Sequence, residues 1–473
     1  MTPIFKKNTL IYGVDDSFES VLSRIKLNRR VYGKSTYVGL GKSCEIQLSD
    51  LDVLFDKIEK IQYINRKLTV EYFRMFAHAV DRESTFGIRM GHMEFLFNCY
   101  VTVWLKLINE KNIQYVIFTN IPHLRWSIAL MCACEILCIK YMSFMPTIDK
   151  NIKGVSLKEN FFDYTSVSNL NSSYFFKEKL SYLLNLAKKQ EYFYSPDNSI
   201  SAKTISYFKI ISVRFTPIFM MYVWVFFSKL LSGKNIIKHP ELSLDFSAGE
   251  VKQVHELLFI RRLKLKLNFL SKLKKEIKLE LNDNAEFNNF VYFPLHYQPE
   301  ATTVPLAIDV SDQVTLAHEL AGLLENYNIK LVVKEHPSTF NPRFRADRGR
   351  FKGYYKFLNS HKNIELVGEN VDTSFFMEHS KFLFTISGTS ALEKVVTGGV
   401  SVIMASHFAE NIPNMHRVES IDKMHATIHR LLSDLSPEKK NEKESEDLSI
   451  VLFDISKDSI LFEEFTTEYF LKE

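Results

Sequence analysis

Three short polar motifs in the last third of the chain each follow an apolar run that predicts a β-strand. They span residues 293–300 (FPLHYQPE), 334–337 (KEHP) and 385–393 (TISGTSALE). In open α/β sheets the ligand lies outside the carboxyl ends of the strands, so three strand-end motifs in one region predict one shared site. Their cations, imidazoles, hydroxyls and small residues are the types that hold the phosphate of a nucleotide.

The KEHP motif places a cation and an imidazole at a strand tip. Residues 331–333 form a short apolar run, and Pro337 stops the strand. We expect Lys334 to add a point charge and His336 to donate to a phosphate oxygen, more strongly when it is protonated. The alternative is a solvated loop histidine.

The third motif predicts a strand over 382–386, a tight turn, and a helix over 391–396. The start of a helix offers free backbone N–H groups and the positive end of the dipole, which attract an anion. Glu393 lies near that start, and we expect it to reach a ribose hydroxyl; the alternative is an ordinary carboxylate favoured by the dipole. The turn residues expected to bind phosphate, or to cap the helix, are Ser387, Gly388, Thr389 and Ser390.

The order of these motifs, followed by two glycines at 398–399 and a strand over 400–404, resembles the nucleotide-binding half of GT-B glycosyltransferases. It looks most like the bacterial capsule polysaccharide synthesis family, which includes Kdo transferases, over residues 285–415. The resemblance implies a GT-B-like α/β fold, with two Rossmann-like domains facing a cleft, and a donor nucleotide that is often CMP. By resemblance, His336 and Ser387 or Thr389 contact the donor phosphate, and Glu393 contacts its sugar.

The motif at 293–300 also resembles surface-polysaccharide proteins of this kind, in which it opens the second domain. We expect its loop to line the cleft, stiffened by Pro294 and Pro299. The polar residues of this cleft loop are His296, Gln298 and Glu300.

Other familiar motifs fail. Residues 39–43 (GLGKS) end like a phosphate loop, but Thr36 stands where that loop requires glycine. Cys132 and Cys134 lack a second pair at zinc spacing, and neither a zincin motif nor a hydrolase nucleophile elbow is present. We therefore predict no metal and no cofactor, the nucleotide sugar being a substrate.

Length and composition indicate a two-domain protein. At 473 residues the chain exceeds one core of usual size, and a net charge of +5 is too mild to imply nucleic acid. Five cysteines favour a reducing compartment, and no apolar core of a signal peptide is seen near the start, so we expect a cytoplasmic protein. The predicted divisions are an acceptor-side α/β domain (1–200), a helical basic and aromatic connector (201–284), a donor-binding α/β domain (285–430), and a charged loop with a tail packing back on the body (431–473).

The connector carries a basic run and an aromatic run. Residues 261–278 hold eight Lys or Arg against one Glu, and the apolar stretch 215–227 is shorter than a membrane span. A basic helix beside an aromatic patch predicts peripheral contact with the inner face of the cytoplasmic membrane. The alternative is a buried helix and a solvated helix face.

The N-terminal half predicts a second α/β unit. A strand over 114–119, a helix over 124–138 and a strand over 139–144 form a β-α-β pattern, with a helix over 93–109 before it and a strand over 9–12 near the start. Glycosyl transfer needs a base for the acceptor hydroxyl, or a carboxylate nucleophile. The candidates in this half are His123, Asp15, Asp16, Asp81 and Glu94, each with the alternative of a surface acid or a loop-stabilising histidine.

The sequence thus predicts a metal-independent glycosyltransferase that moves a sugar, with CMP-Kdo favoured, to a bacterial capsule or other surface polysaccharide or its lipid-linked primer. The expected partners are the nucleotide-sugar donor, a saccharide or glycolipid acceptor, the inner-membrane surface and capsule assembly proteins, but no nucleic acid. Two alternatives stay open. One is a nucleotide-sugar 2-epimerase acting on a UDP-sugar, and the other is a non-catalytic capsule assembly or export partner.

Overall fold

The structure is a computed structural model. It describes residues 7–14, 32–39, 44–47, 50–51, 54, 58, 60–83, 90–147, 152–156, 173–189, 251–281, 287–298, 300, 302–340, 348–368, 371–410, 412–433 and 450–454. Asp15, Asp16, the aromatic stretch 215–227 and the charged part of the tail lie outside these residues, so their predictions stay untested.

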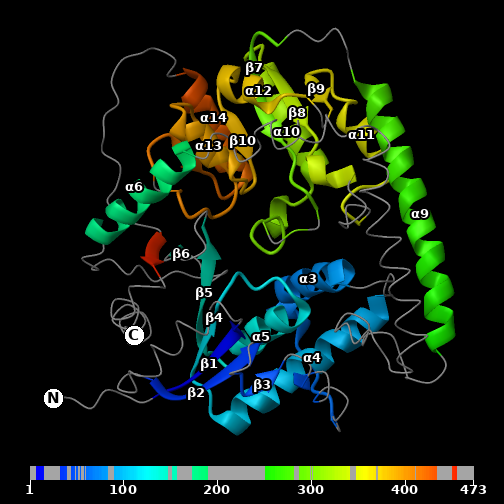
Figure 1. The fold of residues 1–473 in the computed structure, drawn as a ribbon, viewed down its shortest axis with the longest axis vertical. Coiled ribbons are helices and arrows are strands. Elements are labelled where there is room, and N and C mark those ends of the chain that lie inside the picture. The colour runs from blue at the N-terminus through cyan, green and yellow to red at the C-terminus, as the bar shows by residue number, and fades with distance from the viewer. Residues whose placement is uncertain are drawn as a thin grey trace.

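The first unit, in the lower half of Figure 1, is built on a sheet of described strands in the order β13-β6-β5-β4-β1-β2-β3. The strands from β5 to β3 are parallel, whereas β6 and β13 are antiparallel additions. Their bounds are β1 Lys7–Val14, β2 Tyr32–Gly39, β3 Ile46–Gln47, β4 Tyr115–Phe118, β5 Lys140–Pro146, β6 Ile152–Ser156 and β13 Ile450–Asp454. The helices of this unit are α3 Arg66–Glu83, α4 Met90–Lys111 and α5 Arg125–Ile136.

The second unit has a fully parallel sheet in the order β12-β11-β10-β7-β8-β9. Counted from β7, this is the strand order 3-2-1-4-5-6 of a doubly wound nucleotide-binding fold, whose order reverses between β7 and β10. The strands are β7 Phe290–Pro294, β8 Lys330–Lys334, β9 Ile364–Val367, β10 Leu383–Thr385, β11 Ser401–Ile403 and β12 Met415–Arg417. The helical elements are η2 Ile308–Val310, α10 Gln313–Glu325, η3 Pro337–Phe340, α11 Tyr354–Leu358, α12 Thr373–His379, α13 Ser390–Val396 and α14 Ile421–Ser433.

Both faces of the second sheet are buried, which explains why its strands read as continuous apolar runs. Val291 and Phe293 of β7 belong to one hydrophobic cluster, and Phe290 and Tyr292 belong to another. Because side chains alternate along a strand, these clusters lie on opposite faces of the sheet. The sheet is thereby a rigid platform for the loops at its strand ends.

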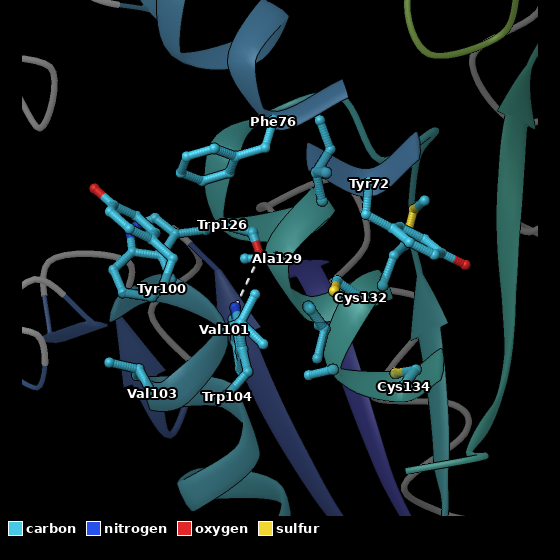
Figure 2. Packing of buried hydrophobic residues seen from close by; sticks show 14 of the residues in the cluster. Tyr72, Phe76, Tyr100, Val101, Val103, Trp104, Trp126, Ala129, Cys132 and Cys134 are labelled. Atoms are coloured by element: carbon cyan, nitrogen blue, oxygen red, sulfur yellow. Dashed lines mark hydrogen bonds between the residues drawn. The ribbon is translucent and has the colours of Figure 1, made fainter. Parts of the chain in front are cut away.

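The core of the first unit packs α4 against α5 and is rich in aromatic rings (Figure 2). Trp104 donates its indole N–H to the carbonyl of Trp126 at 2.8 Å, and the two rings meet edge to face. Cys132 and Cys134 are fully buried in this cluster, and all five cysteines are free thiols. The thiols therefore pack as small apolar groups here.

Two helices accompany the second unit. The long helix α9, Val251–Glu280, runs along one side of the molecule in Figure 1 and buries Leu270, Leu273 and Ile277 in the core of the second unit. The helix α6, Ser173–Lys189, packs against α13, with Leu183 fully buried. The lysines at 272, 275 and 278 on α9 are exposed.

The units touch through shared hydrophobic clusters. Val304 and Ile308, from the loop after β7, lie in the core cluster of the first unit, and Ile121, from the loop after β4, joins a cluster of the second. Among the described residues, two ion pairs also join the units, Arg74 with Asp309 at 3.1 Å and Arg348 with Asp81 at 2.9 Å. The two sheets therefore form one packed body.

The predicted α/β class with two Rossmann-like units is confirmed, since each unit is built on a sheet of mainly parallel strands. Of the predicted helical connector (201–284), the structure describes α9 and no residue before Val251. The predicted strands over 114–119, 139–144, 382–386 and 400–404 correspond to β4, β5, β10 and β11. The predicted domain boundaries stay predictions. Helix α6 packs both on α13 of the second unit and on β13, and β13, from the tail, extends the first sheet.

Candidate functional site

The loops after β7 and β10 meet where the strand order of the second sheet reverses. His296 follows β7, and its Nε2 lies 2.9 Å from Oγ1 of Thr385 at the end of β10. The backbone N–H of Ser387 also points to His296 Nε2, at 3.2 Å. This reversal point is where open parallel sheets bind their ligands. Two of the three predicted motifs are thereby joined by hydrogen bonds at the expected place.

The protonation of His296 follows from these contacts. A backbone N–H can only donate, so Nε2 accepts and the neutral ring carries its proton on Nδ1. Burial, with His336 and Arg350 nearby, lowers the pKa of His296 to about 3. Nδ1–H has no acceptor among the described residues. His296 therefore offers a fixed, neutral donor at neutral pH.

The backbone of His296 is held as firmly as its ring. Its N–H donates to Oε1 of Gln313 at 2.6 Å, and the amide of Gln313 donates back to the carbonyl of His296 at 3.2 Å. Gln313 opens α10 and is buried. This side-chain bracket fixes the loop after β7 to the first turn of α10.

The loop after β8 carries the second histidine. Nδ1 of His336 accepts from the backbone N–H of Ser338 at 3.1 Å, so the neutral ring carries its proton on Nε2. Burial lowers the pKa of His336 to about 4; Glu335 opposes this shift, whereas Arg350 and Lys334 add to it. The expectation of stronger binding by a protonated His336 therefore does not apply at neutral pH. Its ring lies 6.2 Å from that of Tyr297, next to His296.

Lys334 and Glu335, which precede His336, are both buried. Glu335 receives two bonds from the guanidinium of Arg350, each at 2.8 Å, and one from the hydroxyl of Tyr355 at 2.6 Å. Burial by itself raises the pKa of Glu335, but Arg350, Tyr355 and Thr339 outweigh it and hold the pKa below its usual range. Glu335 is thus an ionised, fully hydrogen-bonded structural group.

In the turn after β10, one of the predicted phosphate-binding side chains already forms a hydrogen bond within the protein. The hydroxyl of Ser387 donates to the carbonyl of Thr302 at 2.6 Å. Thr389 is exposed and caps α13 without a side-chain hydrogen bond. A Cβ on Gly388 would lie 3.0 Å from Oγ1 of Thr385 and 3.5 Å from the ring of His296, so the turn passes close to both. Ser390 opens α13 and is half-buried.

Glu393 has an unusual environment for a carboxylate. Its Oε1 is buried and has no hydrogen-bond partner in the described part of the chain. Burial raises the pKa of Glu393 to about 7, so protonated and ionised forms coexist near neutral pH. An ordinary helix-start carboxylate is exposed and fully ionised. The environment of Glu393 therefore differs from that of an ordinary helix-start carboxylate.

Gln298 and Glu300, the other two polar residues of the cleft loop, have different environments. The amide of Gln298 donates to the carbonyl of Ser311 at 2.7 Å, and its oxygen lies 3.3 Å from Arg350. Glu300 is exposed and accepts from the hydroxyl of Thr302. Gln298 thus stabilises the loop, whereas Glu300 faces solvent.

The residues predicted for the chemical step lie in different parts of the first unit. His123 follows β4, and its Nδ1 donates to the carbonyl of Ile121 at 2.6 Å, which leaves Nε2 as the basic atom of the neutral ring. Ile121 contacts the second unit, so His123 lies near the junction of the units. Asp81 is also at this junction, paired with Arg348. Glu94 is exposed on α4.

Sequence reasoning missed three residues that shape the site: Gln313, Thr385 as the partner of His296, and Arg350. A buried carboxylate after a strand calls for a cation, so Glu335 was a signal for a buried arginine. The basic segment 343–350 contains four arginines, and nothing in the sequence selects Arg350 among them.

Neither a metal cluster nor a membrane span is found in the described ranges. No three His, Cys, Asp or Glu side chains there come together in a way that could hold a metal ion. Among those same residues, no helix is both long and apolar enough to span a membrane.

Comparison with known proteins gives the following. No family model and no curated protein sequence matches the chain. Among solved structures, it is similar to a UDP-GlcNAc 2-epimerase of Methanocaldococcus jannaschii in complex with UDP-GlcNAc and UDP, at 10% identity, 97% and 99% coverage of this and that chain, and a TM-score of 0.29. A UDP-GlcNAc 2-epimerase of Neisseria meningitidis bound to UDP-GlcNAc matches at 13% identity, 97% and 99% coverage and a TM-score of 0.22. A glycotransferase of kitacinnamycin matches at 10% identity, 91% coverage of each chain and a TM-score of 0.22. These values are too low to assign an activity to the chain.

Proposed function

We propose that the chain is a sugar-nucleotide enzyme, and specifically a glycosyltransferase, that binds the nucleotide of its donor at the ends of β7, β8 and β10. The observation that carries this proposal is the bridge from His296 to Thr385 and Ser387 across the reversal point of the second sheet. That bridge unites two sequence motifs at the place where the fold binds ligands.

The groups at these strand ends suit a phosphate. His336 and His296 present N–H donors in fixed tautomers, and Lys334 adds positive charge close to His336. Neutral imidazole donors orient a phosphate oxygen without a change of protonation on binding. Glu393, whose pKa is about 7 and whose Oε1 has no partner among the described residues, would accept from or donate to a sugar hydroxyl.

The chemical step requires removal of a proton from the acceptor hydroxyl. Of the N-terminal candidates, we favour His123 as the base, because its Nε2 is the basic atom and its loop contacts the second unit. Asp81 is the second choice, since its carboxylate is already paired with Arg348.

CMP-Kdo is the donor that we favour, on the resemblance of the strand-end motifs, with a surface polysaccharide or its lipid-linked primer as the acceptor. The exposed lysines at 272, 275 and 278 of α9 suit contact with an anionic membrane surface that carries such a primer. Capsule assembly proteins would then be the partners of the chain.

The test is a turnover assay with CMP-Kdo or a UDP-sugar, with and without a lipid-linked saccharide acceptor. The proposal expects nucleotide release that requires the acceptor and is lost in His336→Ala. Inversion of a UDP-sugar at carbon 2 without acceptor would instead indicate a 2-epimerase. Absence of turnover, with normal polysaccharide production in cells that carry His336→Ala, would indicate a non-catalytic assembly partner.

A further inference from the structure

A buried guanidinium connects the loops that carry the two site histidines. The side chains of Arg350 and Glu335 are both 0% exposed. Arg350 donates from Nε and Nη2 to the two oxygens of Glu335, each at 2.8 Å, and Nη2 also donates to the carbonyl of His296 at 3.0 Å. One side chain therefore contacts both the loop after β7 and the loop after β8.

Glu335 also holds the backbone of His336. Its Oε1 accepts from the backbone N–H of His336 at 2.6 Å and from the hydroxyl of Thr339 at 2.9 Å. The Arg350–Glu335 pair thus holds the main chain at both histidines, at the carbonyl of one and the N–H of the other. A planar fork with two parallel bonds gives such a contact a defined direction as well as strength.

The segment that carries Arg350 is pressed against the cleft loop. A Cβ on Gly349 would lie 2.4 Å from the carbonyl oxygen of Gln298, so only glycine allows this approach. Nη1 of Arg350 donates to Oε1 of Gln298 at 3.3 Å, and the guanidinium lies over the ring of Tyr354 at 4.5 Å. The position of Arg350 is therefore defined on several sides.

Arg350 also acts electrostatically on both rings. After burial and His336, its positive charge contributes to the lowered pKa of His296, and it contributes to the lowered pKa of His336. The neutral form is the one that the contacts require, because Nε2 of His296 and Nδ1 of His336 each accept a backbone N–H bond.

We propose that Arg350 is a positioning residue for the nucleotide site: its guanidinium fixes the loops after β7 and β8 relative to one another and thereby places both histidines for the ligand. It acts through Glu335 and the backbone of His296, not by contact with the nucleotide. This inference rests on the proposed function, since it assigns Arg350 a part in the same site.

The first test compares Arg350→Lys with Arg417→Lys by calorimetric titration of CMP, UDP, GDP and CDP and by thermal unfolding. Lysine keeps the charge but cannot form the fork. Arg417 pairs with Glu410 at 3.3 Å, and their side chains are 14% and 3% exposed, so Arg417→Lys makes the same substitution at a largely buried ion pair elsewhere in the same sheet. We expect Arg350→Lys to weaken binding of whichever nucleotide the wild type binds by about tenfold or more, and the control to leave it within about twofold, since a displaced positioning group loses preorganisation.

The second test uses Glu335→Gln/Arg350→Met, which removes both charges and avoids a lone buried ion. The nitrogen-15 shifts of labelled histidines report tautomer and pKa. We expect His296 to lose its pure Nδ1–H form and its pKa to rise from about 3 towards the ordinary value, because Arg350 is among the groups that lower it. The pKa of His336 should change less, because Glu335 and Arg350 act on it in opposite directions.

The two tests separate this inference from the proposed function. If wild type binds none of these four nucleotides, the proposed function fails, and the histidine spectra alone decide on Arg350. An unchanged His296 spectrum in the double variant would overturn the positioning role. So would nucleotide affinities in Arg350→Lys that fall no further than those in Arg417→Lys, because Arg350 would then contribute only to stability.

Discussion

The protonation of single residues in the site is set by neighbours that the sequence does not reveal. The tautomer of His296 depends on the backbone N–H of Ser387, which lies 91 positions away. That of His336 depends on Ser338, two positions away. The sequence motifs predict that these residues gather at one sheet edge, and the first and third do so through direct hydrogen bonds. They do not predict that both histidines are neutral, because this follows from burial and from Arg350.

The raised pKa of Glu393 predicts how the stability of the protein depends on pH. Its pKa of about 7 in the fold lies above the ordinary value of 4.5, so the fold favours the protonated form. Its contribution to stability is complete below pH 4.5 and is lost as the pH rises through about 7, by about 1.4 kcal/mol for each unit of pH in that window. Glu393→Gln should remove this loss and be more stable than wild type at pH 8.

The check is urea unfolding at pH 5 and at pH 8. Glu300→Gln, at an exposed carboxylate of the same region, is the control and should show no such gain. Equal stability of Glu393→Gln and wild type at pH 8 would mean that Glu393 has a partner that satisfies its charge.

Helix α9 is connected to the site through a capping interaction with α11. Glu276 on α9 accepts from the backbone N–H of Gly353 at 3.0 Å and of Tyr355 at 2.9 Å, and thereby caps the start of α11. Tyr355 in turn donates to Glu335. The connector helix is therefore part of the chain of contacts behind the site.

Glu276→Ala should cost about 2–3 kcal/mol of stability, since two backbone donors lose a charged acceptor. The measurement is the free energy of unfolding in urea, with Lys275→Ala at an exposed neighbouring position as the control. A loss equal to that of the control would show that α11 does not depend on α9.

Helices and strands with a clear apolar pattern in the sequence could be predicted, and those without one could not. Residues 114–144 combine an apolar strand, a long apolar helix and another strand, and the structure has β4, α5 and β5 there. By contrast, β12 (Met415–Arg417) has two polar residues out of three, and α11 is only five residues long, so neither shows an apolar pattern in the sequence. Their positions are set by pairing and capping in the folded chain.

On the scale of the whole molecule, the two units share their hydrophobic clusters rather than meeting through charges alone. Val304 and Ile308 lie in the core cluster of the first unit although they follow β7 of the second. The two ion pairs between the units have partly exposed members, and such pairs contribute at most about 1 kcal/mol each. We therefore expect the described body to unfold in one cooperative transition.

Ile308→Asp should disrupt this cooperativity, because it puts a carboxylate into an apolar contact. Scanning calorimetry should then show two transitions, the lower one about 5 °C or more below that of wild type. Asp309→Asn, which weakens only the pair with Arg74, should keep a single transition. Two transitions in the wild type would contradict the account of shared clusters.

The measurement that tests the central claim most directly is calorimetric titration of CMP, UDP, GDP and CDP into wild type and His336→Ala. His336 lies at the tip of β8 and contributes no bond to the Arg350–Glu335 pair through its ring, so its removal should spare the fold. The account predicts that at least one nucleotide binds wild type and that His336→Ala weakens it by about tenfold or more, the loss of one well-placed hydrogen bond to a charged group. Binding of no nucleotide by wild type, or equal affinities in both proteins, would contradict a nucleotide site at these strand ends.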